Sequence, residues 1–158
     1  MSNFKPLNEQ DETRVWERFY HIFRFHPSTT SFPGIKTEKP HLRLDISKYI
    51  INEKPGNELE TIALKLFATI TKPGERLYAL DWQHECYDFD PRMTMERNEF
   101  DEWLIPIIPK GDYYIFLDKD FENVWFGHPW EQTITLIGLA MVHGWEEYGL
   151  KLPELPDA

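Results

Sequence analysis

The chain has 158 residues, of which 41% are hydrophobic and 15% aromatic, so it can build one packed core and is not a disordered protein. Seventeen Lys and Arg stand against 27 Asp and Glu, which gives a formal net charge of −10 at pH 7. A chain this acidic repels phosphate backbones, which disfavours nucleic-acid binding and favours basic partners.

The first predicted element is an amphipathic helix. Its apolar side chains recur at helical spacing and are Val15, Trp16, Phe19, Tyr20 and Phe23. Asp11 or Thr13 can start this helix, since either side chain can accept a hydrogen bond from a free amide of the first turn. Residues 41–47 then alternate apolar and polar side chains, which predicts a strand with one buried face.

The middle of the chain predicts a second helix and a second strand. Apolar residues at helical spacing run from Leu59 to Ile70, and strand-forming residues run from Arg76 to Trp82. Residues 83–98 mix charges and aromatic side chains, so we expect an excursion away from the sheet. A short helical turn is expected over residues 98–105.

The last third predicts consecutive strands and a closing helix. Residues 112–117 are dense in strand formers, residues 124–127 can run back antiparallel to them, and residues 132–137 alternate as a further strand would. We expect a helix over residues 138–148. The order of elements indicates an α+β fold, in which a mainly antiparallel sheet packs against two or three amphipathic helices.

We expect residues 1–158 to form a single globular domain with frayed ends, about 1–10 and 150–158. Cys86 is the only cysteine, so no intramolecular disulfide can form and the thiol suits a reducing compartment. The N-terminus lacks the pattern of a signal peptide, and no apolar run approaches the ~20 residues that cross a membrane. The sequence therefore predicts a cytoplasmic protein without a membrane association.

The most suggestive polar segment runs from residue 81 to residue 87. If the preceding strand continues through it, His84 and Cys86 share one face, and Asp81 and Glu85 share the other. A His and a thiol at this spacing can ligate one metal ion. In the alternative interpretation both side chains pack in the core beside aromatic residues.

A second segment, residues 126–131, places His128 between two aromatic residues and a proline. His128 is the candidate further metal ligand from elsewhere in the chain, or a general base oriented by Glu131 or by a carboxylate near residue 81. The alternative is that the segment forms a rigid corner at one end of a sheet.

Three motifs carry a resemblance to a known family: LDWQHECY (residues 80–87), GDYYIFL (residues 111–117) and FGHPWE (residues 126–131). With WERFYHIFRFHPS (residues 16–28), they resemble a bacterial family of small cytoplasmic proteins that is classed as a domain of unknown function. The resemblance covers most of the chain, from about residue 16 to residue 138. It implies a common fold and no particular reaction.

Two function hypotheses remain open. The first is a non-enzymatic interaction protein, in its most concrete form an immunity-type inhibitor of a basic partner, without a cofactor. Its candidate partner-binding residues are acidic side chains expected on loops: Asp88, Asp90, Asp118, Asp120 and Glu122.

The second hypothesis is a small hydrolase-like enzyme or ligand-binding domain. Its four candidate site residues would converge on one pocket and are Asp81, His84, Glu85 and His128. Motifs for an activated serine or for a phosphate-cradling glycine loop are absent from the sequence. The oligomeric state and the identity of any partner stay open.

Overall fold

The computed structural model describes residues 2–51 and 56–156, in which seven strands form one antiparallel sheet. The strand order is β1-β4-β3-β5-β6-β7-β2, and every neighbouring pair is antiparallel. The strands are β1 (Phe4–Pro6), β2 (His41–Asp45), β3 (Leu77–Asp81), β4 (Tyr87–Phe89), β5 (Tyr114–Leu117), β6 (Val124–His128) and β7 (Thr133–Ile137). The helices are α1 (Glu9–Phe23), α2 (Ser47–Ile51), α3 (Gly56–Thr69) and α4 (Leu139–Tyr148). This arrangement confirms the predicted α+β class.

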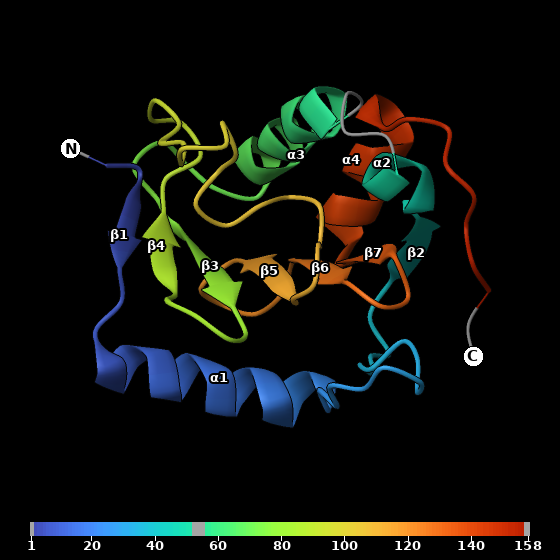
Figure 1. Ribbon diagram of the computed structural model, residues 1–158. Coiled ribbons are helices and arrows are strands. Elements are labelled where there is room, and N and C mark those ends of the chain that lie inside the picture. Colours follow the sequence, from blue (N-terminus) through green and yellow to red (C-terminus); the bar gives the residue numbers. More distant parts are fainter. Residues whose placement is uncertain (1, 52–55, 157–158) are drawn as a thin grey trace.

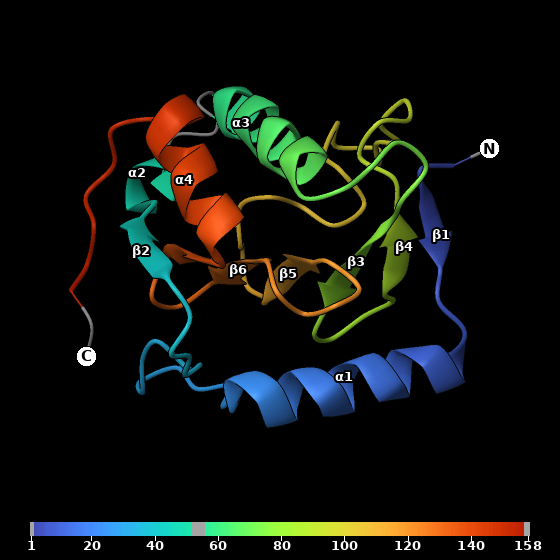
Figure 2. The ribbon, with the colours of Figure 1, turned by 180° about the vertical axis from the view of Figure 1, so that it is seen from behind.

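The helices form layers on both faces of the sheet. Figures 1 and 2 show α1 along one face and α3 with α4 along the opposite face. On the α1 side, Phe19 and Phe126 belong to one buried cluster, whereas Trp125 belongs to a second cluster on the α3–α4 side. Alternate residues of β6 thus enter different layers, as the two-residue period of a strand requires.

The close packing of α3 against α4 depends on a small residue. A side chain added at Gly144 would bring its Cβ within 2.3 Å of Leu66 Cδ2. Glycine therefore lets the two helices approach each other, at the cost of weaker helix propensity.

Several elements differ from the sequence prediction. The cap of α1 is Asn8, which accepts a hydrogen bond from the Asp11 amide, so the helix begins before Asp11 and Thr13. The short elements β1 and α2 were not predicted, and β4 brings residues 87–89 into the sheet. These elements have three to five residues, too few for periodicity to reveal.

The helical turn expected over residues 98–105 does not form. Asn98 instead accepts hydrogen bonds from the amides of Phe100 and Glu102, and Trp103 forms an isolated bridge with Arg97. An Asn side chain that binds nearby amides competes with helix formation, which explains the difference.

Parts of both ends are hydrogen-bonded where we expected fraying. β1 pairs with β4, and the amides of Asp45 and Leu155 donate to the carbonyls of Pro153 and Arg43. The C-terminal segment thereby runs along the edge of β2. In residues 2–51 and 56–156, no helix combines the length and apolarity needed to cross a membrane.

Candidate functional site

Two buried carboxylates meet where β3 ends and β5 begins. Asp81 is the last residue of β3, and Asp112 lies two residues before β5, the strand that pairs with β3. Their residues are 7% and 3% exposed. In an antiparallel pair, the end of one strand lies beside the beginning of the other, so these two acidic residues are close in space although they are far apart in sequence.

A tight turn folds His84 over these two carboxylates. Asp81 Oδ1 accepts hydrogen bonds from the amides of Gln83 (3.0 Å) and His84 (3.1 Å). His84 Nδ1 lies 3.1 Å from both carboxylate oxygens of Asp81 and 3.5 Å from Asp112 Oδ2. We call Asp81, His84 and Asp112 the carboxylate cluster; their ligand-capable atoms lie within 4.8 Å of one another.

The cluster changes the protonation of its members. Burial, followed by a hydrogen bond with Asp81 and the charge of Asp81, raises the pKa of Asp112 to about 7. The hydrogen bond with Asp81 and its charge raise the pKa of the exposed His84. The two carboxylates thus share a buried position, and the His84 side chain contacts both of them.

The strand does not continue through Cys86, which corrects the predicted sharing of faces. Residues 82–86 form a turn and a connection, so Asp81 and His84 meet although alternation would separate them. Cys86 is fully buried in the α1-side core, and its Sγ lies 3.5 Å from the Asp81 carbonyl oxygen. Burial raises the pKa of the thiol to about 12. The ligand-capable atoms grouped with His84 are those of Asp81 and Asp112 and do not include Cys86 Sγ.

His128 lies on the other side of the sheet. Phe126 and His128 share the α1-side face of β6. Asp81 comes two residues after Ala79, which belongs to the α3–α4-side core, so Asp81 points to that opposite face of the sheet. The His128 ring lies 4.8 Å from the Tyr113 ring and is fully buried. The carboxylate cluster therefore does not include His128, and the expected single pocket is not formed.

The surroundings of His128 favour a packing role. The Glu131 amide donates to His128 Nδ1 (3.2 Å), so Nδ1 is the acceptor and the proton of the neutral ring belongs on Nε2. The Glu131 carboxylate accepts a hydrogen bond from Thr133 and does not orient the ring. Burial, followed by the charge of Arg43, lowers the pKa of His128 to about 4, which keeps it neutral near pH 7.

Glu85, the remaining candidate, is exposed and accepts a hydrogen bond from the Tyr87 hydroxyl (3.3 Å). Asp112 is the third member of the cluster, where the sequence analysis expected Glu85 and His128. The sequence marks Asp112 only as an acidic residue between Gly111 and a predicted strand. The pairing of β3 with β5 is what brings it beside Asp81.

Aromatic side chains adjoin the cluster at the same strand ends. Trp82 Nε1 donates to the Tyr20 hydroxyl (3.0 Å), and the Tyr113 ring lies 5.5 Å from both Trp82 and Trp130. Tyr20 and Trp130 are 39% and 40% exposed. A partner can reach these two rings, which are large, rigid and partly polar.

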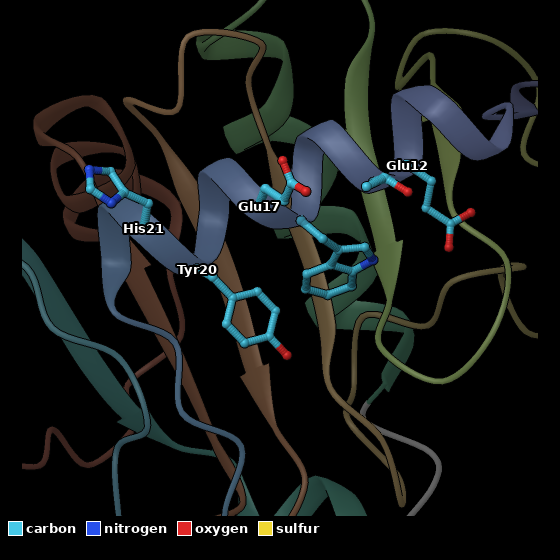
Figure 3. Close-up of a pocket in the computed structure, with 6 residues that line it drawn as sticks. Glu12, Glu17, Tyr20 and His21 are labelled. Carbon is cyan, nitrogen blue, oxygen red and sulfur yellow. The ribbon is translucent and has the colours of Figure 1, made fainter.

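An acidic hollow on α1 extends this region (Figure 3). It measures about 610 Å³, and we call it the helix groove; its lining residues are Glu12, Thr13, Trp16, Glu17, Tyr20 and His21. Burial, followed by charges that include that of Glu85, raises the pKa of Glu12. Tyr20 links the groove to Trp82, the residue that follows Asp81 in the chain.

The acidic residues expected on loops and predicted to bind a partner are mostly engaged within the chain, and Asp88 lies in β4 rather than in a loop. Asp88 pairs with Lys119, and Glu122 pairs with Lys39. Asp90 accepts a hydrogen bond from the Arg92 amide, and Asp118 accepts hydrogen bonds from the amides of Glu122 and Asn123. Among the described residues, Asp120 has no hydrogen-bond or ion-pair partner.

Comparison with known proteins places the chain among proteins of unknown function. A family model with the description "Protein of unknown function (DUF2716)" matches residues 6–142. The uncharacterised protein YxiI of Bacillus subtilis (strain 168) is 34% identical over 145 residues, which cover 87% of this chain and 89% of that protein. No solved structure shows significant similarity. The resemblance drawn from the motifs, to a bacterial family of unknown function, is confirmed.

Proposed function

Because the chain belongs to the DUF2716 family of proteins of unknown function, we propose its role from the site: a non-enzymatic protein that binds a basic partner. The binding surface consists of the carboxylate cluster, Trp82 and the helix groove. An immunity-type inhibitor of a basic protein is the most concrete form of this function. The net charge of −10 supports it, because long-range attraction speeds the encounter with a basic partner.

The observation that carries the proposal is the pair of buried carboxylates, whose ion pairs are formed with the exposed His84. Asp112 is held at a raised pKa, so its ionised form is unfavourable in the free protein. A Lys or Arg of a partner that reaches Asp112 would stabilise the ionised form and gain charge-assisted hydrogen bonds. The cluster is therefore suited to receive a cation.

The aromatic residues beside the cluster supply the apolar part of such an interface. Tyr20 and Trp82 are joined by a hydrogen bond, so their rings are held in place before a partner arrives. Tyr and Trp are enriched among residues that dominate binding energy, and rigid side chains lose little entropy on binding. Glu12 and Glu17 place negative charge beside Trp16 along the groove.

The test uses the tagged full chain as bait in a lysate of the source organism, at low and moderate salt, with mass spectrometry as readout. We expect one basic protein to be captured by the wild type and lost from both Asp112→Asn and Tyr20→Ala. Asp120→Asn is the matched control, since it removes one exposed charge outside the proposed surface. With the captured protein purified, its association rate should fall as salt rises.

The control also separates two surfaces. If Asp120→Asn failed to capture the partner and Asp112→Asn captured it normally, the binding surface would be the loop of residues 118–122 and not the carboxylate cluster. Absence of a basic protein at both salt concentrations would contradict the proposal. Circular dichroism of each variant establishes that the fold is retained.

A second candidate function has its own observation: the ligand-capable atoms of Asp81, His84 and Asp112 lie within 4.8 Å of one another. Two carboxylates and an imidazole can ligate a divalent cation, and the 70% exposed His84 side chain leaves room for water or substrate at the ion. A metal-dependent small hydrolase or ligand-binding domain would use this site. Metal binding requires loss of the His84 proton, so affinity should rise with pH.

Calorimetric titration with Mn²⁺ and Zn²⁺ tests this second candidate. We expect one site in the wild type, abolished by Asp81→Asn and weakened by His84→Ala. His143→Ala is the matched control, because His143 is exposed on α4 and lies outside the cluster. Equal heats from wild type and His84→Ala would exclude a site at the cluster.

A further inference from the structure

A second hollow lies at and beyond the C-terminal end of α1, beside the β2–β7 edge of the sheet. It has a volume of about 1330 Å³. Figures 1 and 2 show that the irregular segment between α1 and β2 covers this end of the sheet, where α1 has already ended. The lining residues are Ile22, Arg24, His26, residues 31–39, His41, Arg43 and Thr135.

The lining is basic although the whole chain is acidic. Its Lys and Arg residues are Arg24, Lys36, Lys39 and Arg43, and Glu38 is the one acidic residue. Lys39 pairs with Glu122 (2.6 Å), and Arg43 has a long contact with Glu131 (3.7 Å). The side chains of Arg24 and Lys36 have no hydrogen-bond or ion-pair partner among the described residues, so the mouth of the hollow keeps positive charge.

Two polar atoms at the floor of the hollow have unused hydrogen-bonding capacity. Arg43 and Thr135 are directly opposed across β2 and β7, so their side chains stand together on one face of the sheet. Thr135 is 3% exposed, and its Oγ1 has no hydrogen-bond partner within the described part of the chain; the same holds for the buried Arg43 Nε. A buried hydroxyl without a partner costs stability, and this one faces a hollow.

An oxyanion satisfies these groups together. Arg43 Nη2 already donates to the Pro156 carbonyl oxygen (2.9 Å), and the Glu131 carboxylate lies 3.7 Å from Nε. Arg43 Nε can donate to a phosphate oxygen, and the Thr135 hydroxyl can donate to the same group. Beside them, Phe32 (38% exposed), Pro33 and Ile35 give the hollow an apolar wall. The hollow of about 1330 Å³ is at least as large as the pockets of about 300–1,000 Å³ that bind small organic ligands. It therefore has room for an organic group attached to the phosphate.

We propose that this hollow binds an organic phosphate monoester, with the phosphate at Arg43 and Thr135 and the apolar group against Phe32 and Ile35. Lys36 and Arg24 attract the anion to the mouth of the hollow. The site is independent of the carboxylate cluster, because it lies at the β2–β7 edge of the sheet, away from the central strands β3 and β5, and has the opposite charge.

Three probes test the proposal by nuclear magnetic resonance of the full chain at constant ionic strength: phenyl phosphate, inorganic phosphate and phenol. Phenyl phosphate should shift the amide signals of residues 24–43 and 133–137 saturably. Inorganic phosphate should act at the same amides more weakly, and phenol should have no saturable effect. Equal affinity for the two anions would identify a site for free phosphate and overturn the monoester assignment.

Variants keep the test decisive. Thr135→Val preserves side-chain shape and should weaken phenyl phosphate binding roughly two- to tenfold through the lost hydrogen bond. Lys36→Gln changes an exposed residue and should weaken binding about two- to fivefold. Lys5→Gln, an exposed charge on β1, is the matched control and should leave affinity unchanged. Absence of saturable shifts, or equal affinity in all three variants, would overturn the proposal.

Discussion

The regions around His84 and His128 contain the same side chain at the ends of two strands, yet they shift its pKa in opposite directions. His84 is exposed and bonded to two carboxylates, which raises its pKa. His128 is buried among aromatic rings, and loss of water lowers its pKa to about 4. The neighbours that the fold places around each ring, and not the residue type, therefore decide which histidine can carry charge.

The largest effect should come from opening the aromatic region around His128. Phe126→Ala removes a fully buried ring that contacts Phe19, Phe25 and Tyr113, so the free energy of unfolding should fall by about 3–5 kcal/mol. Chemical denaturation measures the change. Phe100→Ala is the control, because Phe100 is 73% exposed and should alter stability by less than about 0.5 kcal/mol. A similar loss in both variants would contradict the layered core.

Acidification should destabilise the protein through His128. Its folded pKa of about 4 lies below the unfolded value of about 6.5, so the unfolded state binds the proton first and stability falls as pH drops between these values. Full expression of this shift corresponds to about 3 kcal/mol. Asp112 acts in the opposite sense, because its raised pKa lets the folded state bind a proton over the same window.

Comparison in an Asp112→Asn background separates the two effects. Asp112→Asn should lose stability from about pH 6.5 to about pH 4, and the double variant with His128→Gln should lose less. Denaturation curves across this pH range measure the difference. Parallel pH profiles for the single and the double variant would refute the role of His128.

A smaller, local effect should follow from Asp81→Asn. The pKa of His84 should fall towards its ordinary value because Asp81 is the main cause of its rise. The pKa of Asp112 should also fall from about 7, although burial keeps it above that of an exposed Asp. Nuclear magnetic resonance titration of the imidazole and carboxyl signals checks both shifts. An unchanged His84 titration would show that Asp81 does not control this histidine.

The smallest effect is expected from Glu85→Gln. Glu85 bonds to the Tyr87 hydroxyl and lies outside the carboxylate cluster, so the titration of His84 should stay the same. The same titration experiment detects any change. A clear fall of the His84 pKa in this variant would bring Glu85 back into the site.

The sequence alone determined the main elements of the fold. The periodic apolar residues of α1 and α3 and the alternation in β2 and β7 predicted helices and strands, because such elements must place an apolar side against a core. The density of strand-forming residues predicted β5. It also pointed to Asp81 and His84 as polar residues at the end of a strand. Elements of three to five residues, such as β1 and α2, carry too few residues for this periodic signal.

The tertiary structure decided which polar residues meet. Asp81 and Asp112 are neighbours only because β3 pairs with β5, and Arg43 faces Thr135 only because β2 joins the far edge beside β7. Single-sequence patterns encode the burial of each element separately, whereas pairing between distant strands depends on how all layers pack together. For the same reason the sequence could not separate His84 from His128, which the sheet places on opposite sides.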